Sequence, residues 1–336
     1  MEISKRQWVF IVLIVLMLVG VGGFWPFVFA SILSFGPAYL YLKSIRNSEK
    51  KDKEPWSVVQ TAFIWGAVSG VFYALLLNSL GGTLVYVFSG NNEDLAFVFT
   101  VVLIAPIVEE FVKPLVMFRN SSVRGEIDEI EDGIVYGAAC GLGFGATENI
   151  LYGLSEGYVS SGLLGVLIVV TLRTVSSILL HLTATSFTGH GISRYLVNKE
   201  SFSVVVKYYI FAVFIHAAWN AAAISGSPLL LVFSILLAIG GLEFSKRSIR
   251  NLDMEASNIL PNEIRAVQED KSDWWGASNS KWDQKNIDRN SGVTAPVLNT
   301  PSQSPPEQWA SQMDWKSTIG TIVFLIFLGL NLFGKF

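Results

Sequence analysis

Two adjacent carboxylates, Glu109 and Glu110, lie inside the apolar stretch TVVLIAPIVEEFVKPLVMF, and Lys113 follows them in the same stretch. An ionisable side chain in the middle of a bilayer costs about 2.5–3.5 kcal/mol on insertion scales, so such residues tend to mark functional sites. Two neighbouring carboxylates in a medium of low dielectric cannot both ionise easily. The doublet therefore predicts a general base that works near neutral pH, with the lysine balancing the charge of its neighbour.

Three other apolar stretches also carry polar side chains. They are Glu148 with Asn149, Arg173 with His181, and His216 with Asn220. Counted at about 1.5 Å per helical residue from the nearest basic flank, Glu109 lies about 15 Å, His181 about 20 Å and His216 about 14 Å into the membrane. An acid and two imidazoles at similar depth on separate helices predict one shared cavity inside the bilayer.

The spacing of these residues assigns them to particular helix faces. Side chains four residues apart share a face, so His216 and Asn220 are expected to point into the same cavity. A polar stripe along one helix is predicted by Arg173, Ser177, His181, Thr185 and Gly189. A ridge of small residues, which lets two helices approach closely and brings Glu148 and Asn149 inward, is predicted by Gly133, Gly137, Gly141 and Gly145.

The elements that must position these residues follow from the apolar runs of the chain. Of its 336 residues only 15% are charged, whereas a soluble globular chain carries about 25%. A membrane span needs about 20 predominantly apolar residues. Candidate spans cover residues 8–24, 25–42, 56–77, 95–118, 133–154, 162–188, 207–224, 228–244 and 317–333. The predicted fold class is all-α: a polytopic transmembrane helical bundle of about eight core spans, with one C-terminal span after a disordered tail.

The distribution of basic residues predicts how the chain is oriented. Lys and Arg occur before the first candidate span and after the second, fourth, sixth and eighth, whereas the loops 78–94, 155–161 and 225–227 contain none. Because cytosolic loops carry the excess of basic residues, the N-terminus and the tail 245–316 are predicted to be cytosolic. The chain is therefore expected to be a multi-pass protein of the cell membrane.

Four regions are expected along the chain. They are an N-terminal helical hairpin with a basic cytosolic loop (1–50), an intramembrane core (51–244), a polar tail (245–316) and a C-terminal transmembrane anchor (317–336). The tail is too polar to bury a core and is expected to be disordered, either as a tether or as a segment that binds an unknown partner. A net charge of −3 and one cysteine, Cys140, predict neither a nucleic-acid partner nor an intrachain disulfide.

Five short motifs together resemble the PrsW family of intramembrane proteases, which is related to the CAAX prenyl endopeptidase and bacteriocin-processing superfamily. They are DKEPW (52–56), EEFVK (109–113), GFGATEN (143–149), HLTAT from His181 with the following GHG, and HAAWN (216–220). The resemblance extends from about Asp52 to the end of the eighth span and leaves out the tail and the last span.

This resemblance implies hydrolysis of a peptide bond within or beside the membrane. In some members of the family the substrate is a membrane-anchored anti-sigma factor, so a membrane-anchored regulatory protein is the expected partner, together with the lipid bilayer itself. The positions that match the functional residues of the family are Glu109, Glu110, His181, His216 and Asn220, and Glu148 lies in its third block.

Peptide hydrolysis requires an activated nucleophile and stabilisation of the developing oxyanion. The chain has no H-E-x-x-H motif and offers no evident activated serine, so a glutamate that activates water fits best. Glu109 is predicted to take the proton, helped by His181, while His216 and Asn220 donate hydrogen bonds to the oxyanion. Zinc bound by Glu109, His181 and His216 is the open alternative, since two histidines and one carboxylate form known catalytic zinc sites.

Other interpretations of the same residues remain open. Glu110 and Lys113 would form a purely structural pair, and Arg173 would serve as the counter-ion of Glu148. A proton- or cation-coupled transporter also places glutamate, histidine and asparagine at mid-membrane, although no matching halves of the sequence are visible. A non-catalytic membrane scaffold that presents the tail is a third alternative.

Overall fold

The computed structural model describes residues 3–50 and 53–276, with side chains as far as Met254. All regular elements in these ranges are helices, and seven helical stretches are long and apolar enough to cross a membrane. The predicted all-α membrane bundle is therefore confirmed for the part of the chain that the structure describes. Most of the tail, including its expected partner-binding role, and the predicted anchor 317–336 lie outside the described residues.

The N-terminal hairpin is formed by α1 (Lys5–Gly22) and α2 (Phe24–Arg46). Gly23 joins the two helices with a φ of +84°, a backbone conformation that favours glycine. The next stretch is continuous from Trp56 to Phe88 and consists of α3 (Trp56–Ile64), the π-helical η1 (Trp65–Gly70) and α4 (Val71–Phe88). The predicted end of this span at residue 77 was wrong, because the apolar run continues through α4.

The stretch that carries Glu109 and Glu110 is interrupted by two prolines. Its elements are α5 (Glu93–Phe99), the π-helical η2 (Thr100–Ile104), α6 (Ala105–Val112), the 3₁₀-helical η3 (Lys113–Leu115), α7 (Val116–Arg119) and α8 (Ser121–Gly125). Proline has no backbone N–H, so Pro106 at the start of α6 leaves one carbonyl of η2 without its helical donor. Breaks of this kind often accompany functional sites.

The longest apolar stretch, Ile130–Leu196, turns back on itself. It contains α9 (Ile130–Tyr152), the π-helical η4 (Gly153–Tyr158), α10 (Val159–Thr174) and α11 (Ser177–Leu196). The chain reverses at Ser161 and Gly162, which are non-helical, and the backbones of Gly157 and Gly165 then lie against each other.

The single helix predicted for 162–188 was wrong, because the chain leaves helical geometry between Thr174 and Ser177. Ser176 has φ −127° and ψ −77°. The run TVSS contains neither proline nor glycine, so the sequence carries no signal for this break. The predicted polar stripe consequently divides: Arg173 ends α10, whereas Ser177, His181, Thr185 and Gly189 lie along α11.

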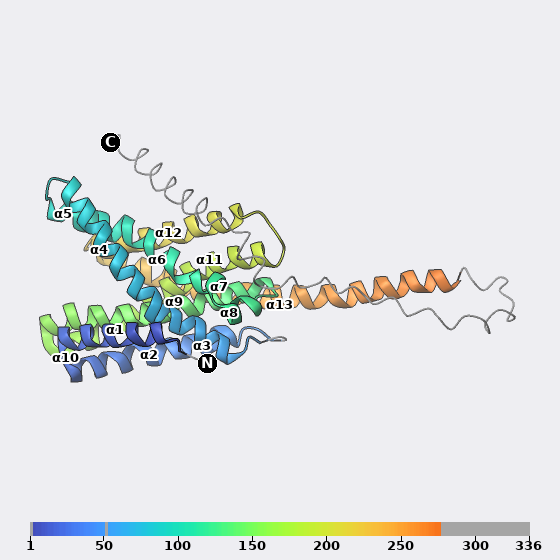
Figure 1. Cartoon of the computed structure of the whole chain (residues 1–336), viewed down its shortest axis with the longest axis horizontal. Helices are drawn as coiled ribbons and strands as arrows, with labels where there is room; N and C mark the ends of the chain where they lie inside the picture. The colour runs from blue at the N-terminus through green and yellow to red at the C-terminus, as the bar shows by residue number, and fades with distance from the viewer. Residues whose placement is uncertain (1–2, 51–52, 277–336) are drawn as a thin grey trace. The chain divides into compact units, whose positions relative to one another are not determined.

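The glycine ridge of α9 packs against α11, as its spacing predicts, and the two helices lie side by side (Figure 1). A Cβ atom at Gly133, Gly137 or Gly141 would clash with backbone carbonyl oxygens of α11, namely those of Gly189, Thr185 and His181. The residue number increases along α9 from Gly133 to Gly141 while that of the facing residue on α11 decreases, so the two helices are antiparallel. Only glycine permits this approach, and it fixes His181 relative to α9.

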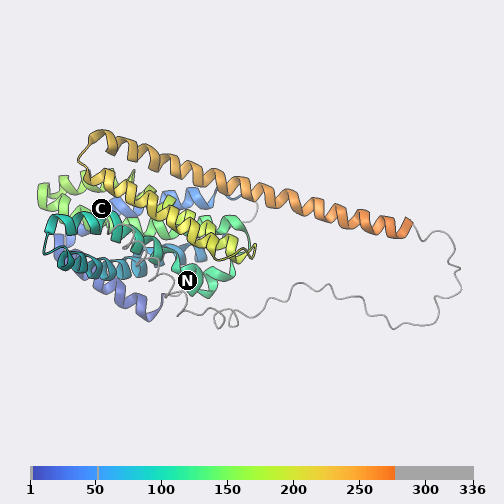
Figure 2. The ribbon, with the colours of Figure 1, turned by 90° about the horizontal axis from the view of Figure 1, so that it is seen from above.

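The remaining described helices are α12 (Ser203–Ile224) and α13 (Pro228–Gly276), and Figure 2 shows α13 as one unbroken helix. The helix therefore continues past residue 244, where the polar tail was expected to begin. The described side chains belong to one compact unit, Met1–Val267. Within this unit many large apolar side chains point outward, while several charged groups are buried, an arrangement that suits a lipid environment.

Candidate active site

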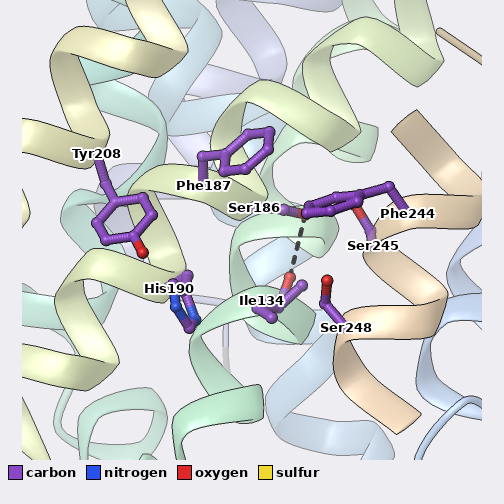
Figure 3. A pocket seen from close by; sticks show the side chains of 8 residues that line it. All are labelled: Ile134, Ser186, Phe187, His190, Tyr208, Phe244, Ser245 and Ser248. Atoms are coloured by element: carbon purple, nitrogen blue, oxygen red, sulfur yellow. Dashed lines mark hydrogen bonds between the residues drawn. The ribbon is translucent and has the colours of Figure 1, made fainter. Parts of the chain in front are cut away.

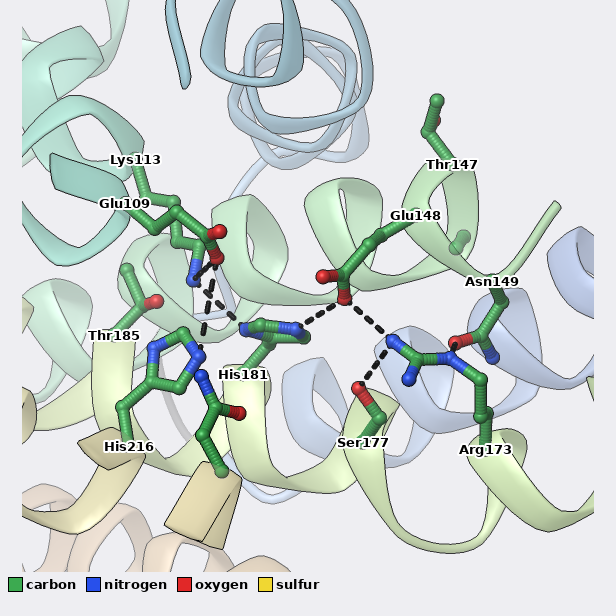
Figure 4. A network of polar contacts seen from close by, with 12 residues as sticks. Glu109, Lys113, Thr147, Glu148, Asn149, Arg173, Ser177, His181, Thr185 and His216 are labelled. Atoms are coloured by element: carbon green, nitrogen blue, oxygen red, sulfur yellow. Dashed lines mark hydrogen bonds and ion pairs between the residues drawn. The ribbon is translucent and has the colours of Figure 1, made fainter. Parts of the chain in front are cut away.

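Three of the predicted site residues meet inside the bundle. Glu109 on α6, His181 on α11 and His216 on α12 are 5%, 1% and 2% exposed, and they offer ligand atoms within 4.8 Å of one another. Figure 4 shows their side chains directed toward one another from separate helices. The three side chains that the sequence predicted to meet therefore lie together in the structure.

Lys113 links the two carboxylates of the doublet. Its Nζ lies 2.7 Å from Glu110 Oε1 and 3.5 Å from Glu109 Oε2, and it is completely buried. Glu110 is also buried, and its Oε2 accepts a hydrogen bond of 3.0 Å from Thr185 Oγ1. Glu110 therefore acts as a firmly held hydrogen-bond acceptor, whereas Oε2 of Glu109 accepts no hydrogen bond.

His216 lies between the two carboxylates. Its Nδ1 is 2.8 Å from Glu110 Oε1. Because Glu110 acts as an acceptor in its other contacts, Nδ1 carries the hydrogen; in the neutral form of the ring the lone pair is then on Nε2. This Nε2 lies 3.9 Å from Glu109 Oε2, a separation at which a water molecule can be shared by both atoms.

Both nitrogens of His181 are engaged. Nδ1 lies 2.8 Å from Lys113 Nζ, and Nε2 lies 2.7 Å from Glu148 Oε2. Because the lysine can only donate, Nδ1 accepts and Nε2 donates to the carboxylate. His181 therefore connects the Glu109–Lys113 pair to Glu148 and contacts the ring of His216 edge-on at 4.9 Å.

A second ion pair continues the network away from the glutamate doublet (Figure 4). Arg173 Nη2 lies 2.8 Å from Glu148 Oε2 and donates to Ser177 Oγ at 3.0 Å, while its Nε donates to Asn149 Oδ1 at 3.0 Å. The Arg173–Glu148 pairing expected from the sequence is therefore present. It bridges the break between α10 and α11, because Arg173 and Ser177 lie on opposite sides of it.

The charges of the network do not cancel. Three carboxylates, Glu109, Glu110 and Glu148, face two cations, Lys113 and Arg173. With both imidazoles neutral, one negative charge remains. A proton or a bound cation at Glu109 would balance it, since Oε2 of this residue is the buried oxygen without a hydrogen bond.

The structure adds one site residue that the sequence prediction missed. Asn78 on α4 donates a hydrogen bond of 3.2 Å from Nδ2 to Glu109 Oε1. The prediction had placed Asn78 in a loop after residue 77. The absence of Lys, Arg, Asp and Glu between Trp56 and Glu93 was the signal that could have extended the span to include it.

Asn220 has a different partner from the expected oxyanion. Its Nδ2 donates to the carbonyl oxygen of Val101 at 2.8 Å. In η2 the N–H of Ala105 bonds to Thr100, so the donor for Val101 would be residue 106, which is proline. Asn220 satisfies this orphan carbonyl and thereby ties α12, which carries His216, to η2, which directly precedes α6 with Glu109.

The residues of the cluster fit a catalytic metal in their donor types. Glu109 Oε2 has no hydrogen-bond partner among the described residues, and His216 Nε2 lies 3.9 Å from it. His181 would complete a set of two imidazoles and one carboxylate. For this, one of its nitrogens must exchange its present partner, Lys113 or Glu148, for the ion.

A separate cavity of about 100 Å³ lies among α9, α11, α12 and α13. It is lined by Ile134, Ser186, Phe187, His190, Tyr208, Phe244, Ser245 and Ser248 (Figure 3). Its lining shares no residue with the glutamate–histidine cluster, and the ring of His190 faces Tyr208 at 5.0 Å. This largely apolar cavity offers no group of converging acids or bases.

Comparison with known proteins identifies one family. The family described as "PrsW family intramembrane metalloprotease" matches residues 54–240, which contain every residue of the cluster. Protease PrsW of Geobacillus kaustophilus is 29% identical over 178 residues, or 53% of this chain and 68% of that protein. No solved structure matches the chain.

Two further relatives bear the same name. Protease PrsW of Bacillus subtilis is 32% identical over 120 residues, which cover 36% of this chain and 49% of the relative. Protease PrsW of Clostridioides difficile is 29% identical over 164 residues, which cover 49% of this chain and 65% of the relative.

Proposed function

Because the chain belongs to the PrsW family of intramembrane metalloproteases, we propose that it hydrolyses a peptide bond of a membrane-anchored protein with a water molecule held between Glu109 and His216. The observation that supports this proposal is the separation of 3.9 Å between Glu109 Oε2 and His216 Nε2. Both side chains are buried, so electrostatic interactions with developing charge are weakly screened.

Each neighbour of the water has a defined role in the proposed reaction. The lone pair on His216 Nε2 aligns the water, and Glu109 takes a proton from it as the water oxygen attacks the peptide carbonyl carbon. Glu109 then returns this proton to the amine nitrogen that leaves when the C–N bond breaks. Glu110 orients His216 through Nδ1, in the way that a second carboxylate orients a catalytic imidazole. Lys113 Nζ forms an ion pair with both carboxylates of the doublet. Its ammonium group is therefore the cation that lies next to Glu109 Oε2, the oxygen proposed to take the proton.

His181, Glu148 and Arg173 act as positioning residues in this proposal. His181 accepts from Lys113 and donates to Glu148, so it keeps the ammonium group directed toward the doublet. Arg173 and Asn149 fix Glu148 from the other side. Asn78 holds Glu109 Oε1 and leaves Oε2 as the oxygen that faces the water.

A divalent metal such as zinc, held by Glu109, His216 and His181, would lower the pKa of its bound water and polarise the peptide carbonyl. The positions of the donor atoms support this assignment. In the same arrangement Glu110 would accept the hydrogen bond from Nδ1 of the metal ligand His216, which fixes the tautomer with the lone pair on Nε2.

The substrate class follows from the depth of the cluster and from the family. A buried acid–imidazole site suits a peptide bond that enters from the membrane, and a regulatory protein such as a membrane-anchored anti-sigma factor is the substrate that we propose. The basic residues of the loops favour a topology in which the N-terminus and the segment after α13 are cytosolic, in the cell membrane.

Reconstitution in liposomes tests the proposed function. The purified chain is combined with tagged single-span candidate substrates, and cleavage and ion-coupled uptake are measured in parallel. We expect cleavage by the wild type, and its loss in Glu109→Gln and in His216→Ala. Glu93→Gln, at an exposed position on α5, is the matched control and should cleave normally.

Ion uptake that depends on Glu109 and is not accompanied by cleavage of any candidate would contradict the proposal in favour of a transporter. Cleavage that persists in both site variants would contradict the assigned residues. Circular dichroism of each variant separates loss of chemistry from loss of fold.

A further inference from the structure

A second group of buried carboxylates lies far from the candidate active site. Glu49 and Glu54 belong to the connection between α2 and α3, and Glu131 and Asp132 begin α9. Their exposed fractions are 0%, 5%, 2% and 2%. Asp132 and Glu148 are separated by 16 residues of α9, or about 24 Å along the helix axis, so this group is independent of the proposed reaction.

Some oxygens of the group have ordinary hydrogen-bond partners. Glu49 Oε2 accepts from the backbone N–H of Glu54 at 3.0 Å, and Glu54 Oε2 accepts from the hydroxyl of Tyr136. Asp132 Oδ2 accepts from the N–H groups of Asp128 and Glu129 at 2.9 and 2.6 Å, which caps the start of α9. Helix capping therefore explains one oxygen of Asp132.

Capping does not explain Glu49, which comes from another segment. Its Oε1 is buried and has no hydrogen-bond partner, and the same is true of Oε1 of Glu131. Burying an unpaired charge is strongly unfavourable unless a partner compensates it.

No described lysine or arginine forms an ion pair with any of the four carboxylates. The guanidinium of Arg46 approaches the group, but its Nε donates to the backbone carbonyl of Glu54, and its planar group lies 4.7 Å from the ring of Trp56. Within the part of the chain that the structure describes, the group therefore presents orphaned carboxylate oxygens without a side-chain cation.

We propose that Glu49, Glu54 and Asp132 bind one hard divalent cation, Ca²⁺ or Mg²⁺, between the α2–α3 connection and the start of α9. One oxygen from each of the three residues lies within 4.8 Å of the others. Oxygen ligands surround Ca²⁺ at about 2.3–2.6 Å, so ligands on opposite sides of the ion are about 5 Å apart. Carboxylate oxygens without nitrogen or sulfur favour such hard cations over zinc.

The ion would join two segments that are distant in the sequence. Glu49 and Glu54 flank the connection to α3, whereas Asp132 lies one residue before Gly133, the first glycine of the ridge that packs on α11. A cation at this point stabilises the α9 end of the α9–α11 pair. It differs from the proposed catalytic metal in its ligands, because the catalytic set contains two imidazoles.

Isothermal titration calorimetry of the purified full-length chain with CaCl₂ and, separately, MgCl₂ tests the proposal, together with thermal unfolding. We expect one of the two cations to bind the wild type and to raise its unfolding temperature. Glu49→Gln should bind at least about tenfold more weakly, because it loses a charged ligand while keeping its shape. In the presence of a chelator Glu49→Gln should be as stable as the wild type or more so, since an uncompensated buried charge is removed.

Two variants locate the ion. Glu109→Gln should bind Ca²⁺ or Mg²⁺ as the wild type does, and so should the exposed control Glu93→Gln. Equal affinity in the wild type and Glu49→Gln, loss of binding in Glu109→Gln, or absence of binding of both cations to the wild type would each overturn the proposal. If Glu49→Gln does not fold, Tb³⁺ luminescence sensitised by Tyr136 and displaced by Ca²⁺ decides the question in the wild type, where absence of a signal counts against the site.

Discussion

Glu110 Oε1 lies 2.8 Å from His216 Nδ1, and this contact determines that the other ring nitrogen, Nε2, faces Glu109 with its lone pair. The two members of the glutamate doublet therefore differ in what they do. Glu110 is held by Lys113, His216 and Thr185, whereas Glu109 keeps one oxygen free of hydrogen bonds. Adjacent residues of a helix point in different directions, which lets one orient and the other react.

This difference predicts unequal effects on the free energy of unfolding when either glutamate of the doublet is replaced. Glu110→Gln removes the charge that compensates the buried Lys113, so we expect a loss of about 3–5 kcal/mol in the free energy of unfolding. Glu109→Gln should leave stability nearly unchanged, because its side chain carries the surplus negative charge of the network. Unfolding in detergent, followed by circular dichroism, measures both variants, and a greater loss for Glu109→Gln than for Glu110→Gln would contradict the assignment.

Asn220→Ala should lower both stability and activity without removing a reacting group. The substitution leaves the half-buried carbonyl of Val101 without its donor, so we expect a loss of about 1 kcal/mol in the free energy of unfolding. Because η2, which leads directly into α6, loses its tie to α12, kcat should fall more than KM rises. Asn198→Ala, at an exposed position, is the control, and equal behaviour of the two variants would show that the tie has no consequence.

Gly141→Ala should disturb the site through the helix pair. A Cβ at this position clashes with the carbonyl oxygen of His181, so we expect a destabilisation of about 1–3 kcal/mol and a loss of cleavage activity. Gly36→Ala on α2 is the matched control, because nothing lies within 4 Å of the added atom. Unfolding temperatures of the two variants compared with the wild type are the measurement, and a tolerant Gly141 would contradict the close packing.

Metal removal separates the two versions of the proposed chemistry. If Glu109, His181 and His216 hold a catalytic ion, dialysis against a strong chelator should abolish cleavage, and zinc should restore it. Elemental analysis should then find about one equivalent of zinc in the wild type and a loss of it in His216→Ala. Undiminished cleavage by metal-depleted protein would limit the mechanism to glutamate and histidine alone.

Much of this architecture could be predicted from the order of apolar and polar residues. The buried charges are costly enough in a membrane that Glu109, His181 and His216 could be expected to meet, and the glycine spacing identified the face of α9 that touches α11. Buried charges and four-residue spacings belong to single helices, so they can be read from the sequence without knowing how the helices pack.

The parts that could not be predicted depend on the partners of individual backbone groups. The role of Asn220 follows from the π-helical turn before Pro106, which decides that Val101 is the carbonyl left without a donor. The break at Ser176 has no glycine or proline to mark it. The Glu49–Glu54–Asp132 group joins distant segments, so no local pattern indicates it.

The central claim is that Glu109 and His216 act together on one water molecule, and a double-mutant cycle on the rate of substrate cleavage tests it most directly. Glu109→Gln and His216→Gln should each lower kcat by at least about 10²-fold. The double variant should lose scarcely more than either single one, because residues that act as a unit are not additive. A loss in the double variant equal to the product of the two single losses, or a single loss below tenfold, would contradict the account.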